Sequence, residues 1–129
     1  MKPTDKYTKL VSKLNRLTKE KKIDWKKVKP PFALKAGVDD VWIDFYSTWY
    51  ADTHIGIGET RIQNYSEDYD KFYWSEKIVW ALLDDNGELE YEFGNAEGLW
   101  NLLETIRRTL ADVDSRIDHL INAPDDEED

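Results

Sequence analysis

The segment 84–87, Asp-Asp-Asn-Gly, constrains the fold of this chain more than any other local feature. Asn and Gly both tolerate a positive φ, and the segment lies between two apolar stretches, so it predicts a β-hairpin. After it, Leu89, Tyr91 and Phe93 alternate with three glutamates, which predicts a strand with one acidic, solvent-facing side. We therefore expect at least one antiparallel strand pair.

Two registers of this hairpin are open. A two-residue turn over the Asn-Gly pair would place Trp80 opposite Phe93 on the core side. A type I turn with a bulge at the glycine would instead place Ala81 near Tyr91 and turn the Trp80 side chain outward. Asp at the first turn position and Gly at the fourth favour the second register.

Three further segments are rich in β-branched and aromatic residues, the composition of β-strands. They are residues 41–50, 54–62 and 72–83. Gly56 and Gly58 fall on one face of the second segment, which indicates a bulge or a close approach by another group. The polar stretch 63–71 is expected to be a loop.

Amphipathic helices are expected at both ends of the chain. In residues 4–20, apolar side chains recur at helical spacing, with Lys and Arg over much of the remaining surface. A second helix should run over residues 96–121, with Asn95 as its N-cap. Its apolar residues are spaced alternately by four and three positions and form a heptad seam of Leu99, Leu103, Ile106, Leu110, Val113, Ile117 and Leu120. The seam predicts packing on the sheet or the first helix, and a dimer seam is the alternative.

The order of these elements predicts a single α+β domain over residues 1–123. It would contain an N-terminal helix, a four-stranded mainly antiparallel sheet and a long C-terminal helix, with both helices on one face of the sheet. Residues 124–129 would form an acidic, disordered tail. The chain has 129 residues, of which 40% are hydrophobic, and this supplies enough apolar surface for one core.

Charge is unevenly distributed along the chain. Residues 1–35 contain 12 Lys and Arg against 3 acids, whereas residues 36–129 contain 6 against 24. An asymmetry of this size bears on binding partners more than on the fold. Either the basic segment neutralises the acidic body of its own chain or of a second subunit, or one of the two surfaces meets an external partner of opposite charge.

Several chemistries lack the residues that they need. Without cysteine the chain has no disulfide, no thiolate zinc site and no cysteine nucleophile. No phosphate loop, dinucleotide fingerprint, zinc-protease motif or EF-hand loop is present. The chain shows neither a signal peptide nor the run of roughly 18 apolar residues that a membrane span needs. We therefore expect a cytoplasmic, non-enzymatic protein that needs no cofactor or metal.

Aromatic residues are the most informative candidates for function, since they make up 13% of the chain. Tyr and Trp concentrate in interfaces because each combines a large, stiff contact area with a polar group. Most of them could equally form the core of a small sheet. If several share an outer face with glutamates, that face suits a partner rich in Lys and Arg. The predicted partner-binding residues are Trp42, Tyr46, Glu88, Glu90 and Glu92.

A small-ligand site, for example for a nucleotide, is the second hypothesis. It would combine an aromatic pocket with lysines of the basic segment, and its candidate residues are Trp49, Tyr50, His54 and Trp74. His54 lies near a carboxylate at Asp52 and could act as a general base, but no nucleophile is evident for it to serve. Direct nucleic-acid binding through the Lys-rich residues 19–29 is not expected, because no recognition helix is apparent.

Residues 14–25, Leu-Asn-Arg-Leu-Thr-Lys-Glu-Lys-Lys-Ile-Asp-Trp, resemble the start of small bacterial and phage domains that share no assigned activity. In those domains a helix ending in Thr-Lys-x-x-Lys-Ile-x-Trp precedes an antiparallel sheet with an Asp-x-x-Gly hairpin and a closing helix. Here residues 84–87 and the helix from Ala96 occupy the matching places. The resemblance implies a mobile-element, toxin–antitoxin or defence-related setting. We therefore expect an antitoxin, immunity or anti-defence protein that masks a basic surface of its partner.

Overall fold

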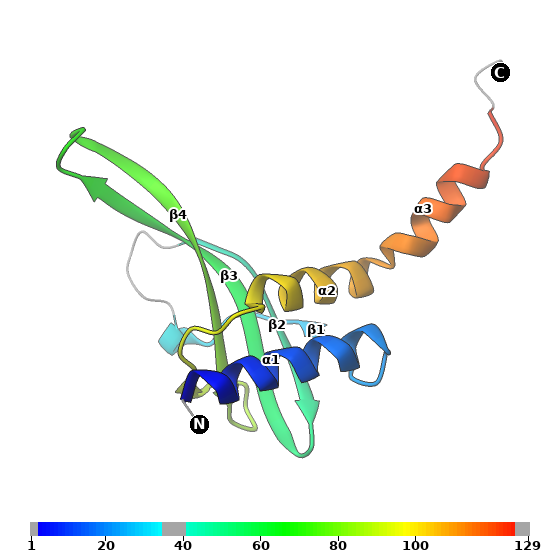
Figure 1. Cartoon of the computed structure of the whole chain (residues 1–129), viewed down its shortest axis with the longest axis horizontal. Coiled ribbons are helices and arrows are strands. Elements are labelled where there is room, and N and C mark those ends of the chain that lie inside the picture. The colour runs from blue at the N-terminus through cyan, green and yellow to red at the C-terminus, as the bar shows by residue number, and fades with distance from the viewer. Residues whose placement is uncertain (1–2, 35–40, 126–129) are drawn as a thin grey trace.

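The computed structural model describes residues 3–34 and 41–125. Its helices are α1 (Pro3–Lys19), α2 (Leu99–Ala111) and α3 (Val113–Asn122), with a short 3₁₀ helix η1 (Phe32–Leu34). Its strands are β1 (Lys26–Lys27), β2 (Val41–Tyr50), β3 (Thr53–Ser66), β4 (Lys71–Leu83) and β5 (Leu89–Glu92). The strands form one antiparallel sheet in the order β1-β2-β3-β4-β5 (Figure 1). The predicted α+β class with an antiparallel sheet is confirmed.

Helices α1 and α2 lie side by side on one face of the sheet (Figure 1). The apolar stripe of α1 is buried there because its helical spacing presents one face to the strands. The core on this face includes Val11, Leu14 and Leu17 of α1, Leu102, Leu103 and Ile106 of α2, and Tyr46, Ile57 and Trp80 of the sheet. A smaller cluster on the opposite face joins Phe45, Val79, Ala81 and Leu83 to Leu34 of η1.

Two glycines allow β2 and β3 to pack closely. A Cβ atom at Gly58 would lie 2.4 Å from the carbonyl oxygen of Asp44. A Cβ atom at Gly56 would lie 2.5 Å from the ring of Phe45. The close approach that the glycine pattern predicts is therefore confirmed, and a phenylalanine side chain together with the neighbouring strand's backbone fills the space.

Over the described ranges 3–34 and 41–125 the sheet has five strands, where the sequence predicts four. The additional strand, β1, is only two residues long and pairs with Tyr46 and Ser47 of β2. A pair of exposed lysines shows no alternation of buried and exposed residues, so no sequence pattern marks this strand.

The loop predicted over residues 63–71 is confined to a turn at residues 67–70, and the rest of that prediction is wrong. β3 runs to Ser66, β4 starts at Lys71, and the two strands pair in a regular register over the whole distance. Most side chains of this part of the hairpin remain exposed or only half-buried. Because neither face is covered, the sequence lacks the alternation that would reveal a strand.

The single helix predicted over residues 96–121 is also wrong. Helix α2 begins at Leu99, after Gly98 with a φ of 87°, and Asn95 does not cap it. Asp112 then adopts a left-handed conformation with a φ of 52° and separates α2 from α3. Asp tolerates this conformation better than most residues, and its backbone N–H donates to the carbonyl oxygens of Arg108 and Thr109. The part of the predicted tail that covers residues 126–129 lies outside the described residues.

The hairpin at residues 84–87 combines features of both registers. The N–H of Gly87 donates to the carbonyl of Asp84 at 3.0 Å, and Gly87 has a φ of 82°. This turn agrees with the second register, but the outward Trp80 that it implies is wrong, because Trp80 is only 1% exposed. The pairing shifts by one residue beside Leu83, and the N–H of Phe93 donates to the carbonyl of Trp80 at 2.9 Å. The shift returns Trp80 to the core.

Candidate functional site

Trp42 and Tyr46, two of the predicted partner-binding residues, point to opposite faces of the sheet. The register between β2 and β3 shifts between Trp42 and Asp44, so the simple alternation fails there. Trp42 packs edge-on against Phe45 on the face away from the helices, with ring centroids 5.6 Å apart. Tyr46 is buried on the helix-covered face. The two aromatic side chains therefore do not contribute to one binding surface.

The three predicted glutamates lie on or beside β5, at the edge of the sheet, and all are exposed. The register shift between Leu82 and Leu83 leaves Glu90 as an extra residue, so their side chains do not line one face. Leu89 packs on the cluster away from the helices, whereas Phe93 packs on the helix-covered core. Glu88, Glu90 and Glu92 thus form an acidic edge and not an acidic face.

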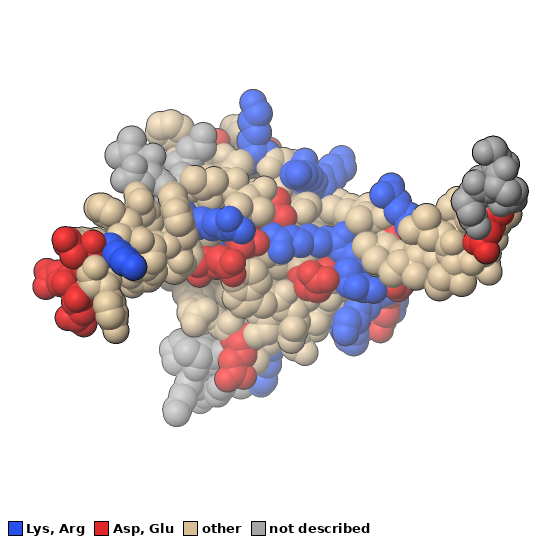
Figure 2. Space-filling view, turned by 90° about the horizontal axis from the view of Figure 1, so that it is seen from above, with Lys and Arg blue, Asp and Glu red and all other residues tan. Residues whose placement is uncertain are grey.

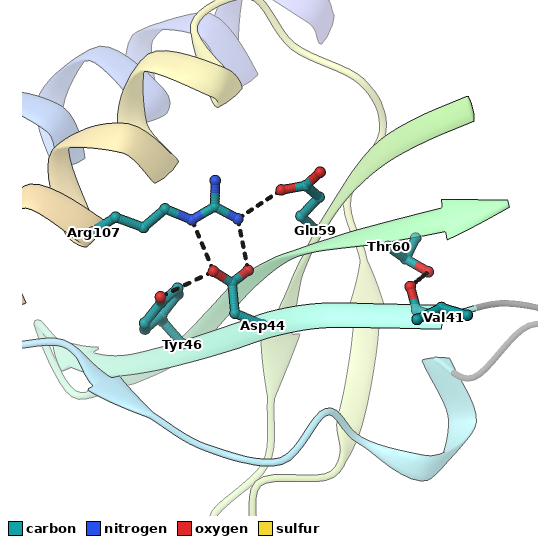
Figure 3. A network of polar contacts seen from close by, with 6 residues as sticks. All are labelled: Val41, Asp44, Tyr46, Glu59, Thr60 and Arg107. Carbon is teal, nitrogen blue, oxygen red and sulfur yellow. Dashed lines mark hydrogen bonds and ion pairs between the residues drawn. The ribbon is translucent and has the colours of Figure 1, made fainter. Parts of the chain in front are cut away.

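A polar cluster joins α2 to the sheet through Arg107 (Figure 3). Its guanidinium donates to both carboxylate oxygens of Asp44, with Nε–Oδ2 at 2.8 Å and Nη2–Oδ1 at 2.9 Å. Nη2 also donates to Glu59 at 2.7 Å. The hydroxyl of Tyr46 donates to Asp44 at 3.0 Å. Sequence analysis misses this cluster, because Arg107 is separated from its two partners by 63 and 48 residues.

The electrostatics of this cluster hold it in one ionisation state. Burial opposes ionisation of Asp44, but hydrogen bonds from Arg107 and Tyr46 and the charge of Arg107 outweigh it, so the pKa of Asp44 lies below its ordinary value. Burial and the hydrogen bond to Asp44 raise the pKa of Tyr46. The hydrogen bond to Asp44 leads the effects that raise the pKa of Arg107. Both oxygens of Asp44 are occupied by partners from the same chain, which suits a structural clamp between α2 and the sheet.

The four candidate ligand-binding residues do not line one pocket. Trp49 and His54 do meet: their rings stack at a centroid distance of 4.5 Å, and His54 Nδ1 lies 2.8 Å from the carbonyl oxygen of Asp84. Tyr50 instead packs against the helix-covered core, under the ammonium of Lys13. Trp74 lies on the far part of the β3–β4 hairpin. The structure therefore supports only half of the proposed aromatic pocket.

The feature that sequence analysis misses is the far part of the β3–β4 hairpin, residues 62–76, here called the distal hairpin. Among the residues that the structure describes, β2 pairs with β3 only as far as Arg61, and β5 pairs with β4 only at residues 81–83. The distal hairpin therefore projects from the body of the molecule (Figure 1). Its large aromatic side chains are about half exposed or more: Tyr65 48%, Tyr69 77%, Phe72 69%, Tyr73 51% and Trp74 51%.

Acidic groups accompany these aromatic side chains. Within residues 62–76 there are four carboxylates, at Glu67, Asp68, Asp70 and Glu76, against the single Lys71. Figure 2 shows the acidic cluster at the end of the molecule formed by the tip of this hairpin, whereas Lys and Arg gather over the body. The hydroxyl of Tyr65 donates to the carboxylate of Asp70, and this bond raises the pKa of Tyr65.

Helix α3 is a second element with uncovered apolar side chains. None of its residues is buried, and Leu120 and Ile121 are more than two thirds exposed. It leads away from the sheet in Figure 1. The C-terminal half of the heptad seam therefore does not pack on the body, whereas Leu99, Leu103 and Ile106 in the N-terminal half do.

Within the described residues, no three His, Asp or Glu side chains are placed to hold a metal ion. No helix in the described part of the chain is both long and apolar enough to cross a membrane. Comparisons with protein-family models, with curated proteins and with solved structures gave no match.

Proposed function

We propose that this chain is a non-enzymatic binding protein, and that its distal hairpin docks on a basic surface of a partner protein. The observation that carries this proposal is the exposure of five large aromatic side chains on a projecting hairpin. Three of the five, Tyr65, Phe72 and Trp74, share one face of the hairpin. Single exposed apolar side chains are ordinary on a protein surface, but a contiguous exposed apolar patch marks an interaction site. Masking the active or nucleic-acid-binding surface of a toxin or effector is the use that fits the mobile-element, toxin–antitoxin or defence-related setting implied by the resemblance of residues 14–25 to small bacterial and phage domains.

The arrangement of the side chains supports a contact surface. Tyr65 and Phe72 are opposite one another in the β3–β4 ladder, with ring centroids 5.2 Å apart. Alternation along β4 puts Phe72 and Trp74 on the same face as Ile78 and Trp80, which pack on the core. Tyr65, Phe72 and Trp74, here called the aromatic strip, thus extend the hydrophobic core beyond the body of the molecule. A partner would bury these rings as the helices bury the rest of this face of the sheet.

Charge supports a basic partner. The carboxylates beside the aromatic strip would speed association with a surface rich in Lys and Arg, and the aromatic contacts would slow dissociation. The same charges keep the exposed strands from pairing indiscriminately with other chains.

The test uses capture of partner proteins from the source organism by the full chain, followed by identification and titration of what is retained. The double variant Phe72→Ser/Trp74→Ser should weaken binding at least tenfold, because it removes the aromatic contact. The double variant Glu67→Lys/Asp68→Lys should slow association and reduce its dependence on salt concentration.

Two control variants change exposed side chains that lie outside the distal hairpin. Phe32→Ser removes another highly exposed aromatic ring, and Glu88→Lys/Glu90→Lys reverses charges on the edge of the sheet. Both controls should bind normally. Retention of full binding by both distal-hairpin variants would refute the proposal.

A further inference from the structure

One edge of β4 is open along most of its length. β4 runs over 13 residues, yet β5 pairs only with Ala81, Leu82 and Leu83. After Phe93 donates to the carbonyl of Trp80, the chain turns away towards α2. Within the described residues no other strand continues along this edge.

The direction of the unpaired backbone groups follows from the ladder. In an antiparallel strand the N–H and C=O groups of every second residue point to the same side. The β3–β4 register has no shift, and the carbonyl of Trp80 points to the β5 side. The backbone groups with the same parity point to the open side as well: they belong to Phe72, Trp74, Glu76 and Ile78. The edge between Phe72 and Ile78 is about 20 Å long at roughly 3.4 Å per residue, enough for one strand of ordinary length.

A groove lies beside the Glu76–Ile78 end of this edge. It has a volume of about 810 Å³, and its walls are Glu76, Lys77 and Ile78 of β4 on one side and residues 92–101 on the other. Three carboxylates, those of Glu76, Glu92 and Glu97, line it against the single Lys77. The half-exposed ring of Trp100 provides an apolar contact at the far wall. The groove is therefore acidic and has room for side chains of a basic segment.

We propose that the open edge of β4 from Phe72 to Ile78 accepts an extended, basic segment of the partner protein as an additional strand in line with β5. Backbone hydrogen bonds to the four outward-facing residues provide affinity, and alternate side chains of the segment contact the acidic groove and the aromatic strip. This inference rests on the proposed function, because it names how the partner binds at the same hairpin.

The test selects peptides from a displayed library of random ten-residue sequences on the full chain at low salt. We expect the enriched peptides to be positively charged and to lack proline in their central part. Binding of a selected peptide should slow hydrogen exchange of the Phe72, Trp74, Glu76 and Ile78 amides at least tenfold. Enrichment of acidic peptides, or protection confined to other amides, would overturn the inference.

Two matched variants separate the backbone contact from the charge. Glu76→Ala and Glu76→Pro both remove the carboxylate, but only proline removes the outward N–H, and an edge position tolerates proline. Glu76→Pro should bind the selected peptide at least tenfold more weakly than Glu76→Ala, with an unchanged circular dichroism spectrum. Should the proline variant not fold, the same loss is expected for a peptide whose alternate backbone nitrogens are methylated. Equal binding by both variants, or by the methylated peptide, contradicts strand addition.

These outcomes are distinguishable from failure of the proposed function. If Phe72→Ser/Trp74→Ser abolishes partner capture while Glu76→Pro and Glu76→Ala bind alike, the hairpin is the binding site but no strand is added. The competing occupant of the β4 edge is a second copy of this chain, and sedimentation of the free chain tests for it. Self-association that Glu76→Pro abolishes would assign the edge to the second copy and overturn the inference of a basic partner segment.

Discussion

The guanidinium of Arg107 on α2 donates two hydrogen bonds, of 2.8 and 2.9 Å, to the carboxylate of Asp44 on β2. The Asp44 side chain is only 8% exposed, as is that of Glu59, which binds the same guanidinium. Two nearly buried carboxylates on neighbouring strands would repel one another without this cation. Arg107 therefore offsets the repulsion between the two carboxylates and fixes α2 over β2 and β3.

Replacing Arg107 should destabilise the fold strongly. Arg107→Met keeps much of the side-chain volume but leaves Asp44 and Glu59 buried without a cation, and we expect a loss of about 3 kcal/mol in the free energy of unfolding. Arg108→Met is the matched control, since Arg108 pairs with Asp114 on the exposed surface and should cost less than about 0.5 kcal/mol. Urea unfolding of the two variants measures both values. Similar losses in the two variants would show that the buried cluster contributes no more to the free energy of unfolding than an exposed ion pair does.

The same pair makes stability depend on pH in a defined direction. Arg107 and Tyr46 lower the pKa of Asp44 in the folded chain below the ordinary value of 3.8. The ionised form is therefore favoured by folding, and its contribution is fully present above pH 3.8 and is lost as the pH falls through the lowered folded pKa. We expect the difference in unfolding free energy between the natural chain and Asp44→Asn to be constant from pH 5 to 7 and to shrink below about pH 4. A difference that grows on acidification would contradict this sign.

Close packing of β2 on β3 gives a third expectation. In Gly58→Ala the new methyl group would meet the Asp44 carbonyl oxygen at 2.4 Å, and a backbone atom cannot move aside cheaply. We expect a loss of about 2 kcal/mol or more in thermal or urea unfolding. Gly94→Ala provides the control, because its new methyl group would lie 3.4 Å from the ring of Tyr7. That substitution should change stability by less than about 0.5 kcal/mol. Equal effects at both glycines would argue against the close approach.

The parts of the fold that sequence patterns predict are those with one buried face. The stripe of Val11, Leu14 and Leu17 predicts α1, because helical spacing and burial coincide there. The strand over residues 41–50 has the predicted bounds, since β-branched and aromatic residues concentrate in it. In both cases the hydrophobic pattern and the packing carry the same information.

The parts that sequence patterns do not predict depend on register, on distant pairs or on missing burial. A register shift of one residue after Trp42 places Trp42 and Tyr46 on opposite faces of the sheet, although simple alternation would put them on the same face. A second shift beside Leu83 returns Trp80 to the core. No local pattern marks such shifts. The pairing of Arg107 with Asp44 joins charges that look like ordinary surface groups. The distal hairpin lacks a buried face, so it resembles a loop in sequence although it is a regular ladder.

The two halves of the heptad seam should respond differently to the same substitution. Ile106 on α2 is fully buried, so Ile106→Ala should lower the unfolding free energy by about 3 kcal/mol. Leu120 on α3 is 71% exposed, so Leu120→Ala should change it by less than about 0.5 kcal/mol when the chain is monomeric. Sedimentation equilibrium decides the dimer that the seam predicts as its alternative use. A natural chain that is dimeric and a Leu120→Ala variant that is monomeric would support pairing through α3, whereas two monomers, or two dimers of equal affinity, would exclude the α3 seam as the contact.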